Sequence, residues 1–253
     1  MTNVVDLQYT IEGPPSRPVV VLAHAIGMSN RMWDPQVATL ASAWRVVRLD
    51  LRGHGDSPVP SGPYTLGELG ADVLRVLDRL SVQRAAIVGL SLGAMVGLWL
   101  AANAPSRVER LVAACAIARP ASPQAWHERG AAVLAGGTAA VADLVVERWG
   151  YANRDAAIES ILRTSLAATP ATGYAGCCEA IAAMDLTGAL GRIQAPTLLL
   201  AGADDPAAPP AAANEIAAAV AGSRVEVVEG AAHLLNVERA DVVTEAILQH
   251  LRR

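Results

Sequence analysis

The sequence contains no lysine and no phenylalanine, and aromatic residues make up only 4% of it. All basic residues are arginines, and the net charge at pH 7 is −4. Nucleic acids and anionic membranes attract proteins with an excess of positive charge, so neither is predicted as a partner. The absence of lysine also excludes the phosphate-binding loop G-x-x-x-x-G-K-[ST].

Cysteines and long apolar runs are scarce as well. The three cysteines, Cys115, Cys177 and Cys178, fit neither a disulfide framework nor the spacing of a zinc site. The longest apolar candidate, 94–102, is far shorter than the roughly 20 residues of a membrane span. The N-terminus lacks a basic start followed by an apolar stretch. We therefore expect a cytoplasmic protein with reduced thiols and no bound metal.

The 253 residues, 53% of them hydrophobic, suffice for one large domain. Seven segments have the apolar run or alternation of a β-strand: 4–12, 18–24, 45–50, 84–89, 108–114, 196–202 and 224–228. Four segments have helical periodicity: 65–80, 92–102, 211–221 and 237–251. Strands that alternate with helices predict an α/β protein with a mostly parallel sheet and helices on both faces.

Residues 120–190 interrupt this alternation. They show amphipathic helical patterns and no convincing strand. We therefore predict a core formed by residues 1–119 and 191–253, with a helical cap over residues 120–190.

Residues 89–93 read Gly-Leu-Ser-Leu-Gly, which is the pattern G-x-S-x-G between a predicted strand and a predicted helix. In this context, a sharp turn strains the backbone of Ser91 and exposes its hydroxyl group. The pattern predicts the α/β-hydrolase fold with Ser91 as the nucleophile. The N–H group of Leu92, at the start of the helix, is predicted to stabilise an oxyanion.

A serine nucleophile needs a base, and a histidine base needs an acid to orient it. His233 follows the last predicted strand, so it lies at the same rim of the sheet as Ser91. Asp205 follows the strand at 196–202 and completes the chain order Ser, Asp, His of this fold, with Asp204 as the alternative acid. His250, in the terminal helix, is predicted to be a surface residue.

Two loops near the predicted site have distinct roles. The loop His24-Ala25-Ile26-Gly27 follows the strand at 18–24, and we expect the N–H group of Ile26 to be the second oxyanion donor. The segment Asp-Leu-Arg-Gly-His-Gly-Asp-Ser at 50–57 is interpreted as structural, with a pair between Asp50 and Arg52.

The chain resembles the cofactor-free 3-oxoadipate enol-lactonases over roughly residues 15–250. The segments that carry the resemblance are MWDPQ at 32–36, DLRGHGDS at 50–57, GPYTLGELGADVLRVLD at 62–78, NAPSRV at 103–108 and GYAGCCEAI at 173–181. Two segments depart from it, namely the loop at 24–28 and residues 150–153.

The resemblance implies the opening of 3-oxoadipate enol-lactone to 3-oxoadipate in aromatic-acid catabolism, without metal or cofactor. Because that substrate carries a carboxylate, we expect a cation near the pocket. Arg148 is the candidate, with Trp126 and Trp149 as pocket walls. The sequence carries no signal for an oligomeric state.

Two alternatives remain open. A carboxylesterase or a carbon–carbon bond hydrolase would share the triad and the fold, with an ester or ketone in place of the lactone. A ligand-binding relative without turnover is disfavoured by the complete set of Ser, Asp and His.

Overall fold

The computed structural model describes residues 4–149, apart from the side chain of Arg148, and residues 156–253. The described residues form one seven-stranded sheet in the order β1-β3-β2-β4-β5-β6-β7, in which β1 is antiparallel to β3 and the other neighbouring strands are parallel. The strands are β1 (Tyr9–Glu12), β2 (Val19–Ala23), β3 (Arg45–Leu49), β4 (Ala85–Leu90), β5 (Val108–Ala114), β6 (Thr197–Gly202) and β7 (Arg224–Val228). The predicted fold class is confirmed.

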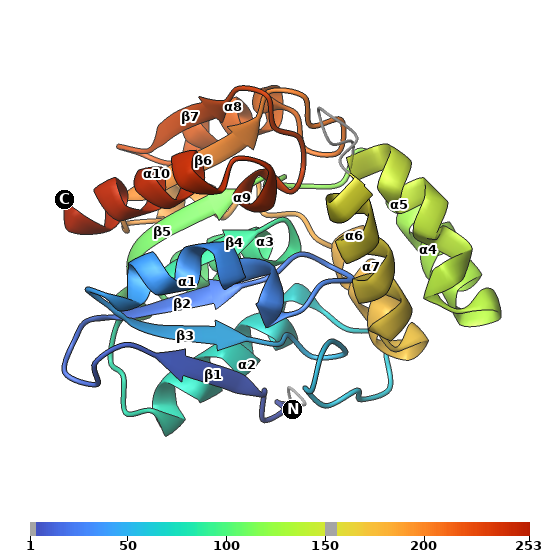
Figure 1. Cartoon of the computed structure of the whole chain (residues 1–253), viewed down its shortest axis with the longest axis horizontal. Coiled ribbons are helices and arrows are strands. Elements are labelled where there is room, and N and C mark those ends of the chain that lie inside the picture. The colour runs from blue at the N-terminus through green and yellow to red at the C-terminus, as the bar shows by residue number, and fades with distance from the viewer. Residues whose placement is uncertain (1–3, 150–155) are drawn as a thin grey trace.

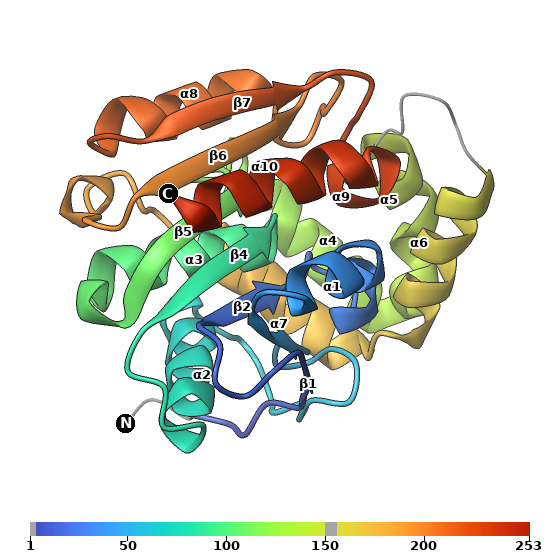
Figure 2. The same ribbon diagram turned by 60° about the vertical axis from the view of Figure 1, so that its left-hand side comes forward.

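Helices cover both faces of the sheet. The helices are α1 (Asp34–Ala41), α2 (Leu66–Arg79), α3 (Leu92–Asn103), α4 (Pro123–Gly136), α5 (Ala142–Trp149), α6 (Ala156–Ala168), α7 (Ala171–Ala182), α8 (Pro210–Ala219), α9 (Leu235–Glu238) and α10 (Ala240–Arg252). Short 3₁₀ turns span Asn30–Trp33, Pro105–Arg107, Thr138–Val141 and Leu190–Arg192. Helices α1, α9 and α10 lie on one face, and α2, α3 and α8 lie on the other (Figures 1 and 2).

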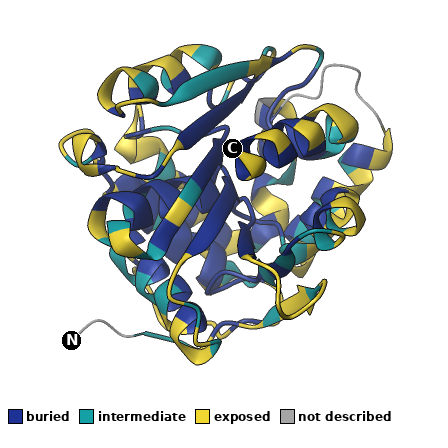
Figure 3. Ribbon diagram, turned by 90° about the vertical axis from the view of Figure 1, so that its left-hand side faces the viewer, coloured by how far each residue is buried: buried dark blue, intermediate teal, exposed yellow. Residues whose placement is uncertain are grey.

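The central strands consist of continuous apolar runs because both of their faces are covered. Every residue of β2, β4 and β6 is buried, and Figure 3 shows the buried core running through the middle of the sheet. Strand β1 is shorter than the predicted 4–12, because the Val5 N–H group donates to Asp72 Oδ1 at 2.8 Å instead of to a neighbouring strand. Among the described residues, no helix is long and apolar enough to cross a membrane.

Helix α2 begins where its sequence predicts. The Thr65 hydroxyl accepts from the Glu68 N–H group, and the Glu68 carboxylate accepts from the Thr65 N–H group at 2.8 Å. This capping box satisfies two donors of the first turn. By contrast, the helix predicted over 237–251 is two helices. Arg239, with φ −132° and ψ 52°, separates α9 from α10.

Two predictions about individual residues are wrong. Arg52 binds Asp72, with Nε 2.6 Å from Oδ2, and both side chains are buried. Asp50 instead accepts from the Asn30 N–H group at 2.7 Å, so the two residues hold different neighbours and do not pair. His250 is buried, because its Nε2–H group donates to the Pro196 carbonyl oxygen at 3.1 Å and fixes α10 against the start of β6.

Helices α4–α7 fall within the segment predicted as a cap. They lie beyond the carboxyl ends of the parallel strands (Figure 1). Helix α7 is in direct contact with the core, because the Tyr64 N–H group donates to the Gly176 carbonyl oxygen at 3.3 Å, and Gly173 lies against the backbone of Gly53. A Cβ atom at position 173 would overlap that backbone. The helix therefore depends on a glycine here.

We expect Gly173→Ala to lower the free energy of unfolding by about 1–3 kcal/mol, the usual cost of overpacking. This is opposite to helix propensity, which favours alanine over glycine by about 1 kcal/mol. Urea unfolding measures the change. Gly188→Ala is the matched control, since Gly188 has open space around its Cβ position. Equal stability of the two variants would contradict the proposed contact.

Candidate active site

Ser91 occupies the turn between β4 and α3. Its backbone has φ 52° and ψ −113°, a left-handed conformation that a non-glycine residue rarely adopts. The Ser91 N–H group donates to the Ala114 carbonyl oxygen on β5 at 2.9 Å and thereby holds this strained turn in place. The residue is buried but lines a cavity whose wall also includes residues of α4, α5 and α8.

His233 and Asp205 come from the loops that follow β7 and β6. The Nδ1–H group of His233 donates to Asp205 Oδ2 at 2.7 Å, and both side chains are buried. Asp205 Oδ1 accepts from the N–H groups of Ala207 and Ala208 at 2.8 and 3.1 Å. Asp204 is exposed, so the structure pairs His233 with Asp205 and not with the alternative acid.

The environment of Asp205 favours its ionised form. Burial alone would raise the pKa of its carboxyl group. The electrostatic attraction and hydrogen bond of His233, together with the hydrogen bonds from Ala208 and Ala207, outweigh burial, so the pKa lies below its ordinary value. An ionised Asp205 fixes the proton of His233 on Nδ1 and leaves Nε2 with a free lone pair, which is the tautomer that a serine hydroxyl needs in its base.

Ser91 and His233 line the same cavity. The hydrogen bonds of the described residues do not include one between the Ser91 hydroxyl and the His233 ring. Such bonds are often long in unliganded enzymes and shorten when substrate binds.

Two buried N–H groups next to Ser91 are without an acceptor in the described part of the chain. They belong to Ile26 and Leu92, the two predicted oxyanion donors. The neighbouring Gly27 N–H group, by contrast, donates to His54 Nε2 at 2.8 Å. A buried N–H group without a partner is uncommon in proteins, so these two donors are available to a ligand atom.

A pair of buried histidines supports the loop that carries Ile26. His24 Nδ1 donates to the Ala25 carbonyl oxygen at 2.7 Å, and its Nε2 accepts from the Leu51 N–H group at 2.9 Å. His54 Nε2 accepts from Gly27, and the two rings lie 5.1 Å apart. Burial lowers the pKa of His24 to about 4 and that of His54 to about 3. Both rings are therefore neutral near pH 7.

The cavity has a volume of about 500 Å³, a size that suits a small molecule. Trp126 and Trp149 line it, at the positions predicted as pocket walls. The Trp149 ring lies 4.9 Å from the His233 ring, and the Trp149 carbonyl oxygen accepts from the His233 N–H group at 3.2 Å. The side chain of Arg148, the predicted cation, lies outside the described residues.

Cys115 lies beside the pair of Asp205 and His233, and one ligand atom of each residue falls within 4.8 Å of the others. Two ligands of one zinc ion lie about 3.3 Å apart, given bond lengths of about 2.0 Å. The 2.7 Å between His233 and Asp205 is instead the length of a hydrogen bond. Burial and the nearby Asp205 raise the pKa of the Cys115 thiol well above its ordinary value, so it is a poor nucleophile.

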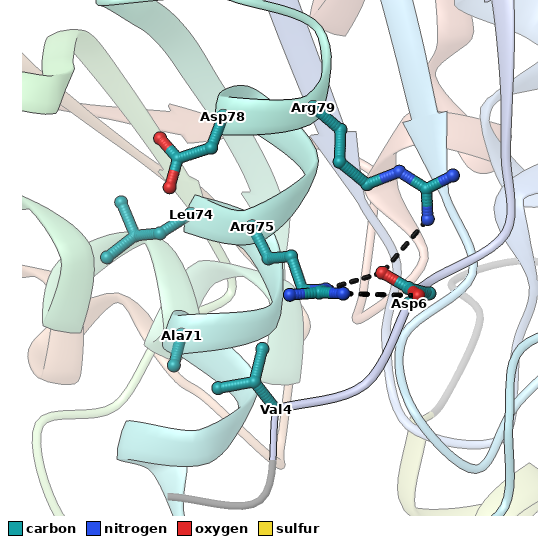
Figure 4. A pocket seen from close by; sticks show the side chains of 7 residues that line it. All are labelled: Val4, Asp6, Ala71, Leu74, Arg75, Asp78 and Arg79. Carbon is teal, nitrogen blue, oxygen red and sulfur yellow. Dashed lines mark hydrogen bonds and ion pairs between the residues drawn. The ribbon is translucent and has the colours of Figure 1, made fainter.

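A second hollow, of about 790 Å³, lies on the surface of α2 beside the N-terminal segment (Figure 4). Its charged residues pair with one another or with neighbours. Asp6 binds Arg75 and Arg79, whose hydrogen bonds lower its pKa to about 2, and Asp78 binds Arg107. The described residues that line it include no serine, cysteine or histidine. The serine and histidine candidates lie instead at the cavity of Ser91.

The fold and the site geometry can be compared with those of known protein families. A family model described as alpha/beta hydrolase fold matches residues 18–150 and 153–240. The chain therefore belongs to the α/β-hydrolase fold family.

Relatives narrow this class. 3-Oxoadipate enol-lactonase 2 of Acinetobacter baylyi is 34% identical to this chain. The match covers 98% of this chain and 94% of the relative. 3-Oxoadipate enol-lactonase 1 of the same organism is 36% identical to this chain, over 93% of this chain and 89% of the relative. The crystal structure of the enol-lactonase from Burkholderia xenovorans superposes with a TM-score of 0.94 at 39% identity, covering 98% of this chain and 96% of the other. The predicted resemblance to the enol-lactonases is confirmed, and the chain is a hydrolase related to them.

The buried histidines make stability depend on pH. Above about pH 6.5 a histidine is neutral in both the folded and the unfolded chain. As the pH falls toward 4, His24 and His54 become protonated in the unfolded chain. In the folded chain they stay largely neutral, because their pKa values there are about 4 and 3. Each histidine then lowers the free energy of unfolding by up to about 1.4 kcal/mol per pH unit.

We expect His54→Gln to make this decline shallower by about 1.4 kcal/mol per pH unit between pH 6 and 4. The glutamine oxygen can still accept from the Gly27 N–H group, and the titrating ring is gone. Urea unfolding at several pH values gives the slope, and circular dichroism at pH 8 verifies the fold. An unchanged slope would show that His54 is already protonated in the native state.

Proposed function

We propose that this chain hydrolyses 3-oxoadipate enol-lactone to 3-oxoadipate by serine-based acyl-enzyme chemistry. The observation that carries the proposal is the 2.7 Å hydrogen bond between His233 and Asp205, at a cavity that a strained Ser91 also lines. The enol-lactonase relatives supply the substrate. In aromatic-acid catabolism, the reaction opens a lactone ring.

In the first step, the Ser91 hydroxyl attacks the lactone carbonyl while His233 Nε2 takes its proton. The oxyanion that develops accepts hydrogen bonds from the N–H groups of Ile26 and Leu92. Loss of one such donor typically costs about 100- to 1,000-fold in rate. Asp205 stabilises the imidazolium that forms on His233.

In the second step, the carbon–oxygen bond of the ring breaks and the acyl-enzyme forms. The enol oxygen takes the proton from His233 and the enol tautomerises to the ketone. Water then attacks the acyl-enzyme while His233 takes its proton, and the same imidazolium returns that proton to Ser91. The product is 3-oxoadipate, and His233 carries the proton transfers of both acyl-transfer steps.

The side chains of the cap supply the walls of the pocket. Trp149 packs on the ring of His233 and Trp126 lines the same cavity, so both would contact the substrate. Arg148 stays a proposed cation near the pocket.

We expect the purified protein to cleave 3-oxoadipate enol-lactone with a kcat/KM of about 10⁴ to 10⁸ M⁻¹s⁻¹. Ser91→Ala should lower kcat on the order of 10⁶-fold, as removal of a triad nucleophile does. Loss of the lactone's ultraviolet absorbance measures the rate.

A p-nitrophenyl ester and a fluorophosphonate label complete this experiment. Cleavage of the ester without the lactone would favour the carboxylesterase alternative. If the unmodified protein cleaves neither compound and Ser91 does not react with the label, the protein is a ligand-binding relative without turnover.

We expect Asp205→Asn to lower kcat by about 10⁴-fold, because an amide in place of the carboxylate favours the wrong tautomer of His233. Asp204→Asn removes a charge one residue away, from an exposed side chain, and should keep kcat within about twofold. The same lactone assay compares the two variants. A larger loss in the Asp204 variant would identify Asp204 as the acid.

A further inference from the structure

Arg129 is a buried cation at the wall of the catalytic cavity. It lies on α4, only 7% of its surface is exposed, and it lines the same cavity as Ser91 and His233. Sequence reasoning overlooked it. Residues 125 and 133, four positions away on either side, are alanine and valine, so the helix offers it no acidic partner at that spacing.

No carboxylate pairs with Arg129 among the described residues. One terminal nitrogen, Nη2, donates to the Tyr174 hydroxyl, and the buried Nε has no hydrogen-bond partner in this part of the chain. Burial raises the pKa of Tyr174 far above its ordinary value. The phenol is therefore neutral, so it does not balance the charge of Arg129.

Aromatic rings hold the guanidinium in the absence of an acid. Its central carbon lies 4.9 Å from the centre of the Trp126 ring and 5.3 Å from that of Tyr174. Such cation–π contacts stabilise a guanidinium by less than the cost of burying an unpaired charge. Arg52, the other deeply buried arginine described above, has Asp72 as its counter-ion. A charge left unbalanced beside a cavity favours an anionic ligand there.

We propose that Arg129 binds a free carboxylate of the substrate, so that the site selects esters and lactones that carry an anionic group away from the reacting carbonyl. The inference rests on the proposed hydrolysis at Ser91, and it names the residue that confers specificity for a charged substrate. A planar guanidinium with an unpaired Nε can donate to a carboxylate through two parallel N–H groups.

Arg119 offers a natural comparison. It lines the same cavity, but its side chain is exposed and it lies near the carboxylate of Asp185. Solvent screens its charge, so its attraction for a substrate anion is weak. Glu215 also lines the cavity from an exposed position and would repel an anion only weakly.

The experiment uses two p-nitrophenyl esters, the neutral acetate and the mono-ester of glutaric acid, which keeps a free carboxylate. The unmodified protein should prefer the glutarate ester. Arg129→Met should lower kcat/KM for this ester by about 10- to 100-fold, mainly through KM, since a hydrogen bond to a charged group is lost. The acetate should change by less than about threefold. The matched variant Arg119→Met should change both esters by less than about threefold.

A second variant separates binding from packing. Tyr174→Phe removes the hydrogen bond between α4 and α7 and keeps the cation, so the preference for the glutarate ester should persist. If Arg129→Met slows both esters equally, or if Tyr174→Phe reproduces its effect, Arg129 only braces the helices and the proposal is overturned. Absence of a preference in the unmodified protein overturns it as well.

The lactone assay keeps this inference distinct from the proposed function. If the enol-lactone is not cleaved but the glutarate ester depends on Arg129, the lactone assignment fails and the carboxylate site stands. If the lactone is cleaved equally well by Arg129→Met, the lactone assignment stands and the carboxylate site fails.

Discussion

The close approach of α3 to β2 is the contact on which the whole site depends. The Gly93 N–H group donates to the His24 carbonyl oxygen at 3.0 Å, and a Cβ atom at position 93 would overlap the backbone of Ala23. Only glycine lets the helix start this near the neighbouring strand. Because of this contact, the strained turn at Ser91 and the loop at Ile26 lie side by side, and Ser91 and Ile26 line the same cavity.

The catalytic histidine candidate depends on both layers of the molecule. Asp205, from the loop after β6, accepts a hydrogen bond from Nδ1 of the His233 ring. Trp149, from α5, packs on that ring, and its carbonyl oxygen accepts from the His233 backbone N–H group. A change in the helices above the sheet therefore reaches the position of the base directly. The packing of these helices and the position of the His233 ring are therefore linked.

The sequence predicted the features that depend on residues close together in the chain. The strands, the turn at Ser91 and the order of the three candidate residues follow from apolar periodicity and from glycines at fixed spacing. The side-chain contacts between residues far apart in the sequence could not be predicted in this way. Arg52 binds Asp72, 20 residues away, and His250 binds a carbonyl group 54 residues away, because packing of distant elements decides these contacts. Arg129 was overlooked for the same reason, since periodicity does not distinguish a solvated arginine from one facing a cavity.

The backbone contact between α7 and the loop at Gly53 has a consequence for how this enzyme class can change. One helix of the predicted cap, α7, is fixed to the core by glycines, while its neighbour α4 contributes Ala125, Trp126 and Arg129 to the wall of the cavity. Anchoring and recognition are thus assigned to different helices. Substitutions at the cavity-facing positions of α4 can therefore change the pocket while the glycine contacts that hold α7 to the core stay intact.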